Sequence, residues 1–175
     1  MAILGVDDFK AKLAGGGARP NLFKVTVNFP AYAGGNVEQT SFMCKGAQLP
    51  ASVISPIPVS FRGRQLQIAG DRTFEPWTVT IINTTDFAVR DSMEAWMNGI
   101  NGHATNTGLV NPADYQSDLI VDQLDRDESV LKSYTFRGCF PTNVGAIDLN
   151  YDTTGAIEEF PVEFQIQYWE SNTTT

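Results

Sequence analysis

The sequence contains few residues of the kinds that build catalytic and metal sites. Among 175 residues there are two cysteines, Cys44 and Cys139, and one histidine, His103. The cysteines form no CxxC pair, which argues against a zinc site and a disulfide framework and fits a reducing compartment. We expect both thiols to be buried and reduced. His103 stands in a Gly- and Asn-rich loop without a nearby nucleophile motif, so an exposed loop histidine is favoured over a catalytic one.

Motifs that bind phosphate or calcium are missing as well. The sequence has no GxxxxGK(S/T) motif, and the GxxG at residues 99–102 lies where a helix is expected to end. Four residues match the first, third, fifth and twelfth positions of a calcium loop: Asp148, Asn150, Asp152 and Glu159. Thr153 replaces the glycine needed at the sixth position, which favours a hairpin turn. We therefore expect no enzyme activity, no cofactor and no metal site.

Positive charge and long apolar runs are scarce. The sequence has 12 basic and 20 acidic residues, which gives a formal net charge of -8. Because phosphate contacts need clustered Lys and Arg, this balance disfavours a surface that binds nucleic acid. No apolar run is long enough to span a bilayer, and the N-terminus has no basic-then-apolar leader. We expect synthesis in the cytoplasm and no membrane insertion.

Aromatic residues, by contrast, are abundant. The chain has 11 Phe, 3 Trp and 5 Tyr, many at alternating positions, which favours a β-rich core. A chain of this length suits a single domain over residues 1–175. Residues 1–17 are expected to form an N-terminal arm, whose short helix carries Leu4, Phe9 and Leu13 on one face. Residues 171–175 are expected to be a flexible polar tail.

Period-two alternation predicts most of the strands. Residues 57–83 contain two strand candidates joined by a polar, glycine-bearing turn, and Trp77, Val79 and Ile81 of the second should face the core. Residues 22–29 predict a strand. Residues 39–48, carrying Phe42 and Cys44 on one face, predict a second strand that returns as a hairpin.

The second half of the chain is expected to contain one helix and further strands. A helix is predicted over residues 86–101 with Thr85 as N-cap. Its apolar stripe comprises Val89, Met93, Trp96, Met97 and Ile100. Strands are predicted at residues 119–124 and 131–140, and a last hairpin joins residues 146–151 to 157–169. In that final strand, Phe160, Val162, Phe164, Ile166 and Tyr168 should be buried.

Residues 49–58 stand apart because they contain three prolines. Proline cannot donate to a sheet ladder, so this segment is expected to be an extended edge or a projecting loop. Three arginines follow closely, at Arg62, Arg64 and Arg72. From the residues alone they are equally compatible with ordinary surface charge and with contacts to a partner.

The pattern as a whole indicates a mainly β domain, a β-barrel or two packed antiparallel sheets with one amphipathic α-helix. Exposed edge strands promote aggregation unless they are covered or paired with another copy. A ring of subunits joined edge to edge leaves no edge, so self-assembly is the leading functional hypothesis. The alternative from another class is a monomeric β-barrel that binds a small ligand or carbohydrate, and mass in solution separates the two.

Four stretches carry a resemblance to a known family: ARPNLFKVTV, AGDRTFEPWTVTIIN, GCFPTNVGAIDLNYD and VEFQIQYWE. In sequence and order they resemble the tail tube proteins of contractile-tailed bacteriophages of the T-even type. The resemblance extends over residues 18–170. It implies hexameric rings whose inner strands close into one barrel and which stack into a hollow tube inside a sheath. The tube would conduct the genome into the host and would be part of the virion, assembled in the host cytoplasm.

The resemblance also implies partners and surfaces. The partners would be further copies of the chain, the tail sheath, a baseplate or tube initiator, a tail terminator, a tape-measure protein, and DNA that passes without specific binding. Residues of the arginine- and proline-bearing segment become candidates for a subunit or ring interface: Pro50, Val53, Ile54, Pro56, Ile57, Arg62, Arg64 and Arg72. The alternative within the class is the tube of a type VI secretion or tailocin-like injection system, which would not carry DNA.

A DNA conduit should avoid cations on its inner wall, because each phosphate contact releases counterions and adds affinity. We therefore expect an acidic, amide-rich lumen. The polar face of the last strands supplies the candidates: Asp148, Asn150, Glu159, Glu163, Gln165 and Gln167. The alternative is that these groups face outside solvent and serve solubility.

Overall fold

The computed structural model describes residues 5–174, so Leu4 of the expected N-terminal helix lies outside the described residues. Its helices are α1 Val6–Lys12, η1 Ala14–Gly16, η2 Ala31–Ala33, α2 Val37–Met43, α3 Ala88–Ile100 and α4 Pro112–Tyr115. Its strands are β1 Phe23–Val27, β2 Cys44–Ala47, β3 Val53–Phe61, β4 Arg64–Thr73, β5 Trp77–Ile82, β6 Ser117–Leu124, β7 Val130–Val144, β8 Glu159–Gln165 and β9 Tyr168–Ser171. The prediction of a mainly β chain is confirmed.

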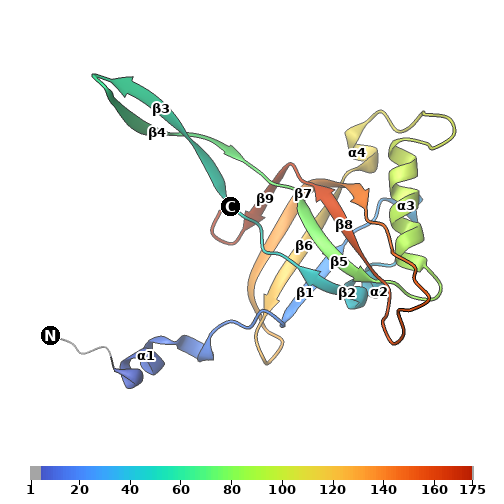
Figure 1. Cartoon of the computed structure of the whole chain (residues 1–175), viewed down its shortest axis with the longest axis horizontal. Coiled ribbons are helices and arrows are strands. Elements are labelled where there is room, and N and C mark those ends of the chain that lie inside the picture. The colour runs from blue at the N-terminus through green and yellow to red at the C-terminus, as the bar shows by residue number, and fades with distance from the viewer. Residues whose placement is uncertain (1–4, 175) are drawn as a thin grey trace.

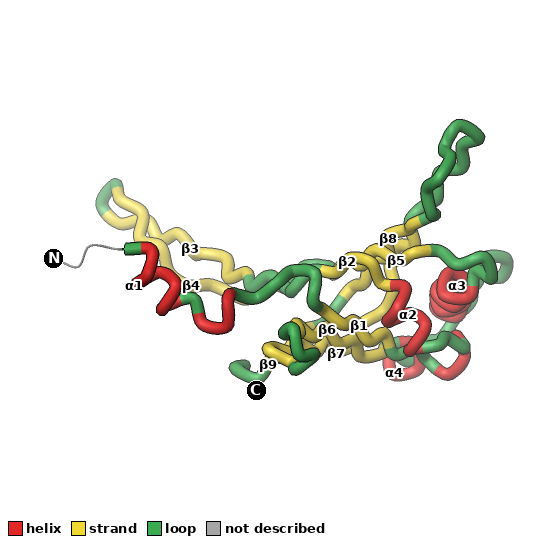
Figure 2. Tube along the Cα trace, turned by 90° about the horizontal axis from the view of Figure 1, so that it is seen from below, coloured by secondary structure: helices red, strands yellow, loops and turns green. Residues whose placement is uncertain are grey.

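The body consists of two antiparallel layers that share β7 (Figure 2). One layer, sheet A, has the order β1-β6-β7-β9. The other, sheet B, has the order β2-β5-β8-β7. The first part of β7 pairs with β6 and β9, whereas residues 140–144 pair with β8, so this long strand crosses from one layer to the other. The prediction of two packed antiparallel sheets is confirmed.

The core lies between the layers, where the alternating residues of β5 and β8 point inward. Trp77, Val79 and Ile81 are buried as predicted, and Ile81 pairs with the fully buried Phe160. The Trp77 ring stacks on Phe136 of sheet A with centroids 4.4 Å apart. Each such apolar side chain contributes roughly 1.5–3 kcal/mol when fully buried. These contacts hold the two sheets together.

Helix α3 covers one open end of the layered body (Figure 1). Val89, Met93 and Trp96 are buried, as the predicted stripe requires, and the Trp96 indole N–H donates to the Tyr115 carbonyl at 2.7 Å. The predicted N-cap at Thr85 is wrong. The helix begins at Ala88 after Phe87, whose backbone is left-handed at φ 53°, so the chain turns sharply into the helix two residues later than a Thr85 cap requires.

The expected hairpin between residues 22–29 and 39–48 is wrong. Asn36 Oδ1 accepts from the Gln39 N–H at 3.0 Å, and this cap starts α2 where a strand was expected. Only Cys44–Ala47 becomes a strand, and it pairs with β5, so α2 carries the chain from sheet A to sheet B. Cys44 is buried as expected, but Phe42 is exposed on the helix.

The last part of the chain also differs from the expected hairpin. Residues 146–151 form no strand, because β7 continues through Pro141 to Val144 and residues 145–158 make a loop instead. The final strand is interrupted at Ile166, which is buried, and Gln167, and so divides into β8 in sheet B and β9 in sheet A. Tyr168 is therefore half-exposed and not buried as predicted.

The expected division into one domain, an arm and a tail stays a prediction. Ser171 ends β9, and its N–H donates to Thr174 Oγ1 at 2.8 Å. Thr175 lies outside the described residues.

Candidate assembly surfaces

Strands β3 and β4 form a separate two-stranded sheet that projects from the body (Figures 1 and 2). Its tip is the pair Arg62 and Gly63, with φ of 47° and 78°, which is a two-residue turn of the kind favoured in tight hairpins. The single polar turn expected to join two strands within residues 57–83 is thus wrong, because Arg64–Thr73 form a further ten-residue strand between them. A projecting segment was expected from the prolines, and the structure confirms it.

The hairpin has one apolar and one polar face. Ile57 pairs with Ile68, Val59 with Leu66 and Phe61 with Arg64, and paired residues share a face. The apolar members of this face are Ile57, Val59, Phe61, Leu66 and Ile68, with exposed fractions between 42% and 68%, and Arg64 lies on it at the tip. The opposite face carries Pro58, Ser60, Gln65 and Gln67. An isolated two-stranded sheet is marginal in water, so the apolar face indicates a surface that needs a partner.

The predicted interface residues are spread along this hairpin. Arg62 and Arg64 lie at its tip, where the Arg62 guanidinium sits 5.3 Å from the Phe61 ring centroid. Arg72 lies near the body end of β4, opposite Ile54. The remaining candidates belong to β3 or to the segment leading into it: Pro50, Val53, Pro56 and Ile57. The sequence analysis did not select Val59, Phe61, Leu66 and Ile68. The signal that could have found them is their alternation with polar residues along residues 57–68.

Two tryptophans fasten the base of the hairpin to the body. The Trp77 indole N–H donates to the Gln48 carbonyl at 2.6 Å, and the Trp169 indole N–H donates to the Ala51 carbonyl at 3.2 Å. Both carbonyls lie in the segment between β2 and β3. These bonds fix the direction in which the hairpin leaves the two layers.

Helix α1 is a second projecting element, and it leaves the body on the same side as the hairpin (Figure 1). Val6, Phe9 and Leu13 recur at helical spacing and are 71%, 64% and 43% exposed. The helix has seven residues and no buried side chain. Because so short a helix is marginal alone, it also needs a surface to lie on.

The layers themselves have edges that nothing pairs with in the part of the chain that the structure describes. In sheet A the outer side of β1 is unpaired, and in sheet B the outer side of β2 is unpaired. Residues 140–144 of β7 pair with β8 on one side, while pairing with β6 ends at Cys139. Sheet B therefore has one unpaired edge at β2 and another at residues 140–144.

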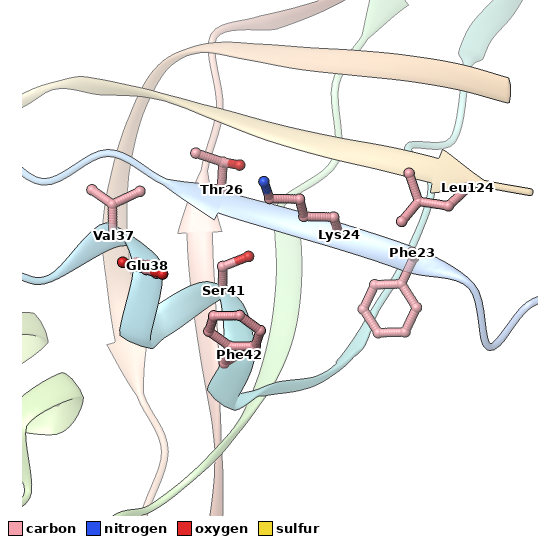
Figure 3. Close-up of a pocket in the computed structure, with 8 residues that line it drawn as sticks. All are labelled: Phe23, Lys24, Thr26, Val37, Glu38, Ser41, Phe42 and Leu124. Carbon is pink, nitrogen blue, oxygen red and sulfur yellow. The ribbon is translucent and has the colours of Figure 1, made fainter. Parts of the chain in front are cut away.

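A groove of about 590 Å³ lies between β1 and α2 (Figure 3). Its lining is Phe23, Lys24, Thr26, Val37, Glu38, Ser41, Phe42 and Leu124. The Phe42 side chain is 75% exposed, which is unusual for a phenylalanine that lies only two residues before a strand of the core, β2. Glu38 lies one helical turn before it on α2.

A second groove, the α3–β7 groove, follows the unpaired end of β7. It comprises two adjoining hollows of about 360 and 250 Å³ that share Met97 and His103. The rest of its lining is Arg90, Glu94, Ile100, Asn101, Phe140, Pro141, Thr142, Asn143 and Val144. Arg90 Nε lies 2.9 Å from Glu94 Oε1, and its Nη1 donates to the Gly145 carbonyl at 3.0 Å. His103 Nδ1 lies 3.0 Å from Asn98 Oδ1, in the loop where it was expected.

The predicted lumen residues fall into two groups. Glu159, Glu163 and Gln165 occupy β8 positions that alternate with its buried residues, so they lie on the outer face of sheet B. Glu163 stands beside Thr78 of β5 and Asn143 of β7, and Glu159 is ion-paired with Lys45. This face is therefore polar but close to neutral.

The other lumen candidates lie elsewhere. Asp148 and Asn150 belong to the loop over residues 145–158 and line a hollow of about 370 Å³ with Glu158 and Glu159. Their predicted place on a strand is wrong. Gln167 follows β8 at the crossing to sheet A, where its N–H donates to the Arg137 carbonyl at 3.1 Å.

The structure offers little for chemistry. Within residues 5–174 no three His, Cys, Asp or Glu side chains gather in a way that could hold a metal ion. The free thiols of Cys44 and Cys139 are buried, and burial raises their pKa values to about 11 and about 12. None of the helices in the described part of the chain is long and apolar enough to cross a membrane.

Comparison with known proteins gives consistent matches. The model of the family described as phage tail tube protein matches residues 18–172. The tail tube protein of Enterobacteria phage T4 is 38% identical over 167 residues, which is 94% of this chain and 99% of the relative. The tail tube protein of Serratia phage KSP90 is 31% identical over 165 residues, which is 91% of this chain and 93% of that protein.

Solved structures with a similar fold come from injection machines. A chain of the sheath–tube complex of the extracellular contractile injection system PVC in its extended state superposes with a TM-score of 0.59. It is 11% identical, and the match covers 97% of this chain and 99% of that one. A chain of the anti-feeding prophage cap gives a TM-score of 0.60 at 14% identity, covering 89% and 91%. At these identities the likeness concerns the fold.

Proposed function

This chain belongs to the phage tail tube protein family, and we propose that it assembles as hexameric rings that stack into the inner tube of a contractile phage tail. Its role is structural and its place is the virion tail. The observation that carries the proposal is the 38% identity to a tail tube protein along nearly the whole of both chains. The tube would be the conduit through which DNA enters the host.

The exposed surfaces support assembly over a monomeric binding module. Many of the large apolar side chains outside the core gather on two projecting elements, the apolar face of the hairpin and α1, while others, such as Phe42 and Val110, are scattered over the body. A ligand-binding barrel would instead concentrate apolar surface inside a concave pocket. Projections of this kind are stable when a neighbouring subunit covers them.

We assign the hairpin and α1 to contacts with other subunits or rings. The predicted interface residues support this, since the eight of them lie along the hairpin or in the segment leading into it. Arginines at the tip add charge-assisted contacts to an apolar surface, a combination enriched at protein interfaces.

The outer face of sheet B is the best candidate for the inner wall of the tube. It carries Glu159, Glu163 and Gln165 beside threonine and asparagine side chains. Lys45 neutralises Glu159, so Glu163 supplies the acidic character we expect of a lumen that does not retain DNA. Asp148, Asn150 and Gln167 are retained as candidates near the ends of this wall.

The partners follow from the same role. We propose that the assembled tube contacts a tail sheath, a baseplate or tube initiator, a tail terminator and a tape-measure protein. Chains of similar fold occur in a sheath–tube complex, a sheath/tube terminator and a baseplate of contractile injection systems.

A second candidate function is the tube of an injection system that carries no DNA. The fold match to the PVC sheath–tube complex favours it, because it covers 97% of this chain. The much higher identity to phage tail tube proteins favours the phage role. A nuclease-protection assay on purified particles whose ejection has been stalled distinguishes the two functions. Protected DNA inside the tube supports the phage role, and its absence supports the injection system.

Light scattering and negative-stain microscopy of the purified chain test assembly directly. We expect rings or tubes at micromolar concentration, with or without a baseplate-like initiator. A strictly monomeric species at every concentration, with the initiator present, would contradict the proposed function.

A further inference from the structure

The groove between β1 and α2, called the β1–α2 groove below, exposes apolar side chains beside a free sheet edge. The Phe23 ring comes from β1 and the Phe42 ring from α2, and Leu124 of β6 also lines the groove (Figure 3). Within residues 5–174 the outer side of β1 pairs with no strand. An occupant of the groove would therefore bury apolar surface and cover this edge at the same time.

The β1–α2 groove also contains two opposite charges without ionic partners. Lys24 follows Phe23 on β1, and Glu38 lies on α2 beside Val37, at the end of the groove away from Phe23 (Figure 3). Neither side chain forms an ion pair in the described part of the chain. A matching occupant brings a cation to the Glu38 end and a carboxylate toward Lys24.

Helix α1 presents a surface with these properties. Its apolar stripe of Val6, Phe9 and Leu13 is exposed, and the helix buries no side chain. Acidic residues stand in its first turn, and Lys10 and Lys12 stand in its last turn. By helical geometry the two lysines flank the apolar stripe, one on each side. The helix therefore combines an apolar face with a negative first turn and a positive last turn.

The path of the arm directs α1 away from the groove of its own copy. Gln123 Nε2 donates to the carbonyls of Arg19 and Leu22, both at 2.7 Å, and the Leu124 N–H donates to the Leu22 carbonyl at 2.9 Å. These bonds fix residues 19–22 against the end of β6, so the arm continues the line of β1 out of the body (Figure 1). We therefore look for the occupant of the groove in another copy.

The directions of the elements agree with a contact between stacked copies. Helix α1 lies beyond one end of the body and α2 lies toward the other end (Figures 1 and 2). Rings in a stack share one axis, and translation along it or rotation about it leaves each element's direction along the axis unchanged. Because α1 and β1 run the same way along the molecule (Figure 1), the first turn of an incoming α1 lies toward Phe23 and its last turn toward Glu38. This orientation brings opposite charges together at both ends.

We propose that α1 of each copy docks in the β1–α2 groove of a copy in the next ring. Its apolar stripe packs against Phe23, Phe42 and Leu124, and Lys12 lies beside Glu38. The inference rests on the proposed function and assigns the contact of the N-terminal arm to a particular groove. It gives the exposed Phe42 ring a partner and covers the free edge of β1.

Disulfide trapping in assembled tubes tests the docking. The double variant Phe9→Cys, Phe42→Cys, mildly oxidised, should give a non-reducing gel ladder that continues beyond six chains, because the contact runs from ring to ring. Each single variant should stay monomeric, since Cys44 and Cys139 are buried. The matched control joins Phe42→Cys to Ala11→Cys, which lies on the opposite side of α1 from the apolar stripe, and should give little or no ladder.

The outcomes separate this inference from the proposed function. Tubes of the Phe9 double variant without a ladder, or an equal ladder with the Ala11 control, would overturn the docking and leave the tube role intact. A ladder that ends at six chains would place the contact within a ring, and a disulfide within single chains would place α1 in its own groove. Either result would also overturn the proposal. Failure of the unmodified chain to form tubes would count against the proposed function instead.

A charge exchange covers the case in which the cysteine variants do not assemble. Lys12→Glu and Glu38→Lys should each raise the concentration needed for assembly about threefold, since an ion pair at the rim of a contact is weak. The double variant Lys12→Glu, Glu38→Lys should return it to the unmodified value, because the pair is restored with its signs exchanged. Lys12→Glu combined with Glu128→Lys, in the turn between β6 and β7, should show no such rescue. A Glu38 double variant no better than its single variants, or equal rescue by Glu128→Lys, would refute the docking.

Discussion

At the scale of residues, the two thiols show how burial sets chemistry. Cys139 is fully buried and Cys44 nearly so. Burial raises the pKa of the Cys139 thiol from 9.0 to about 12 and that of the Cys44 thiol from 9.0 to about 11. We expect negligible reaction with a thiol reagent at pH 8 in the folded protein and two thiols per chain after denaturation. A covalent dimer on a non-reducing gel of intact particles would contradict this.

The same pKa shifts predict a dependence of stability on pH. Both pKa values are raised in the folded state, which therefore favours the neutral thiols. Their contribution to the free energy of unfolding is fully present below pH 9. It is lost progressively as pH rises from 9, where the thiols of the unfolded chain ionise, to between 11 and 12, where the buried thiols ionise as well. The urea midpoint should therefore fall more between pH 9 and 11 in the unmodified chain than in a Cys44→Ala, Cys139→Ala variant. Parallel declines in both proteins would show that other groups control alkaline unfolding.

Gly70 marks a close approach inside the hairpin. A Cβ at this position would lie 2.5 Å from the Ser55 carbonyl oxygen and 2.9 Å from Ile57 Cγ1. Gly70→Ala should therefore distort the register shift between Ile54 and Pro56 and weaken tube formation. The melting temperature of the monomer should change by less than about 2 °C, because the hairpin lies outside the core. Gln67→Ala is the matched control, and equal tube yields from both would refute the role of Gly70.

At the scale of elements, the hairpin's two faces make opposite predictions. Leu66→Asp lies on the apolar face and should abolish tubes, since it removes roughly 2 kcal/mol of burial from every subunit contact and adds a charge. Gln67→Asp, on the adjacent residue but the opposite face, should leave assembly nearly unchanged. Circular dichroism should show both variants folded. Tube yield by sedimentation is the measurement, and a similar yield from the two variants would mean that the apolar face stays exposed.

The elements also show what the sequence could predict. Strands β1, β5, β6 and β8 and helix α3 carry strong periodic signals, because each buries one face in the core. Helix α2 could not be predicted this way, since it bridges the gap between the sheets and buries only Thr40 fully. Strand β4 was missed because its pairing depends on the Arg62 turn and not on burial. The α3–β7 groove unites residues some 40 positions apart and has no local signal.

At the scale of the whole molecule, the inner wall of the tube is where charge should matter. Glu163→Lys, built into phage with normal tails, should slow DNA ejection at low salt, because a ring of added cations would hold phosphates. Raising the salt concentration should restore the rate. Glu128→Lys, in the turn between β6 and β7, adds the same charge away from sheet B and should have no effect. If both variants eject DNA at the unmodified rate, the outer face of sheet B is not the lumen.

Assembly itself is the central claim, and a cryo-electron microscopy reconstruction of the tube tests it most directly. We predict six copies per ring, sheet B facing a channel wide enough for duplex DNA, and the apolar face of every hairpin covered by another subunit. A reconstruction with sheet B on the outside, or with Ile57, Phe61 and Leu66 exposed to solvent, would contradict the account.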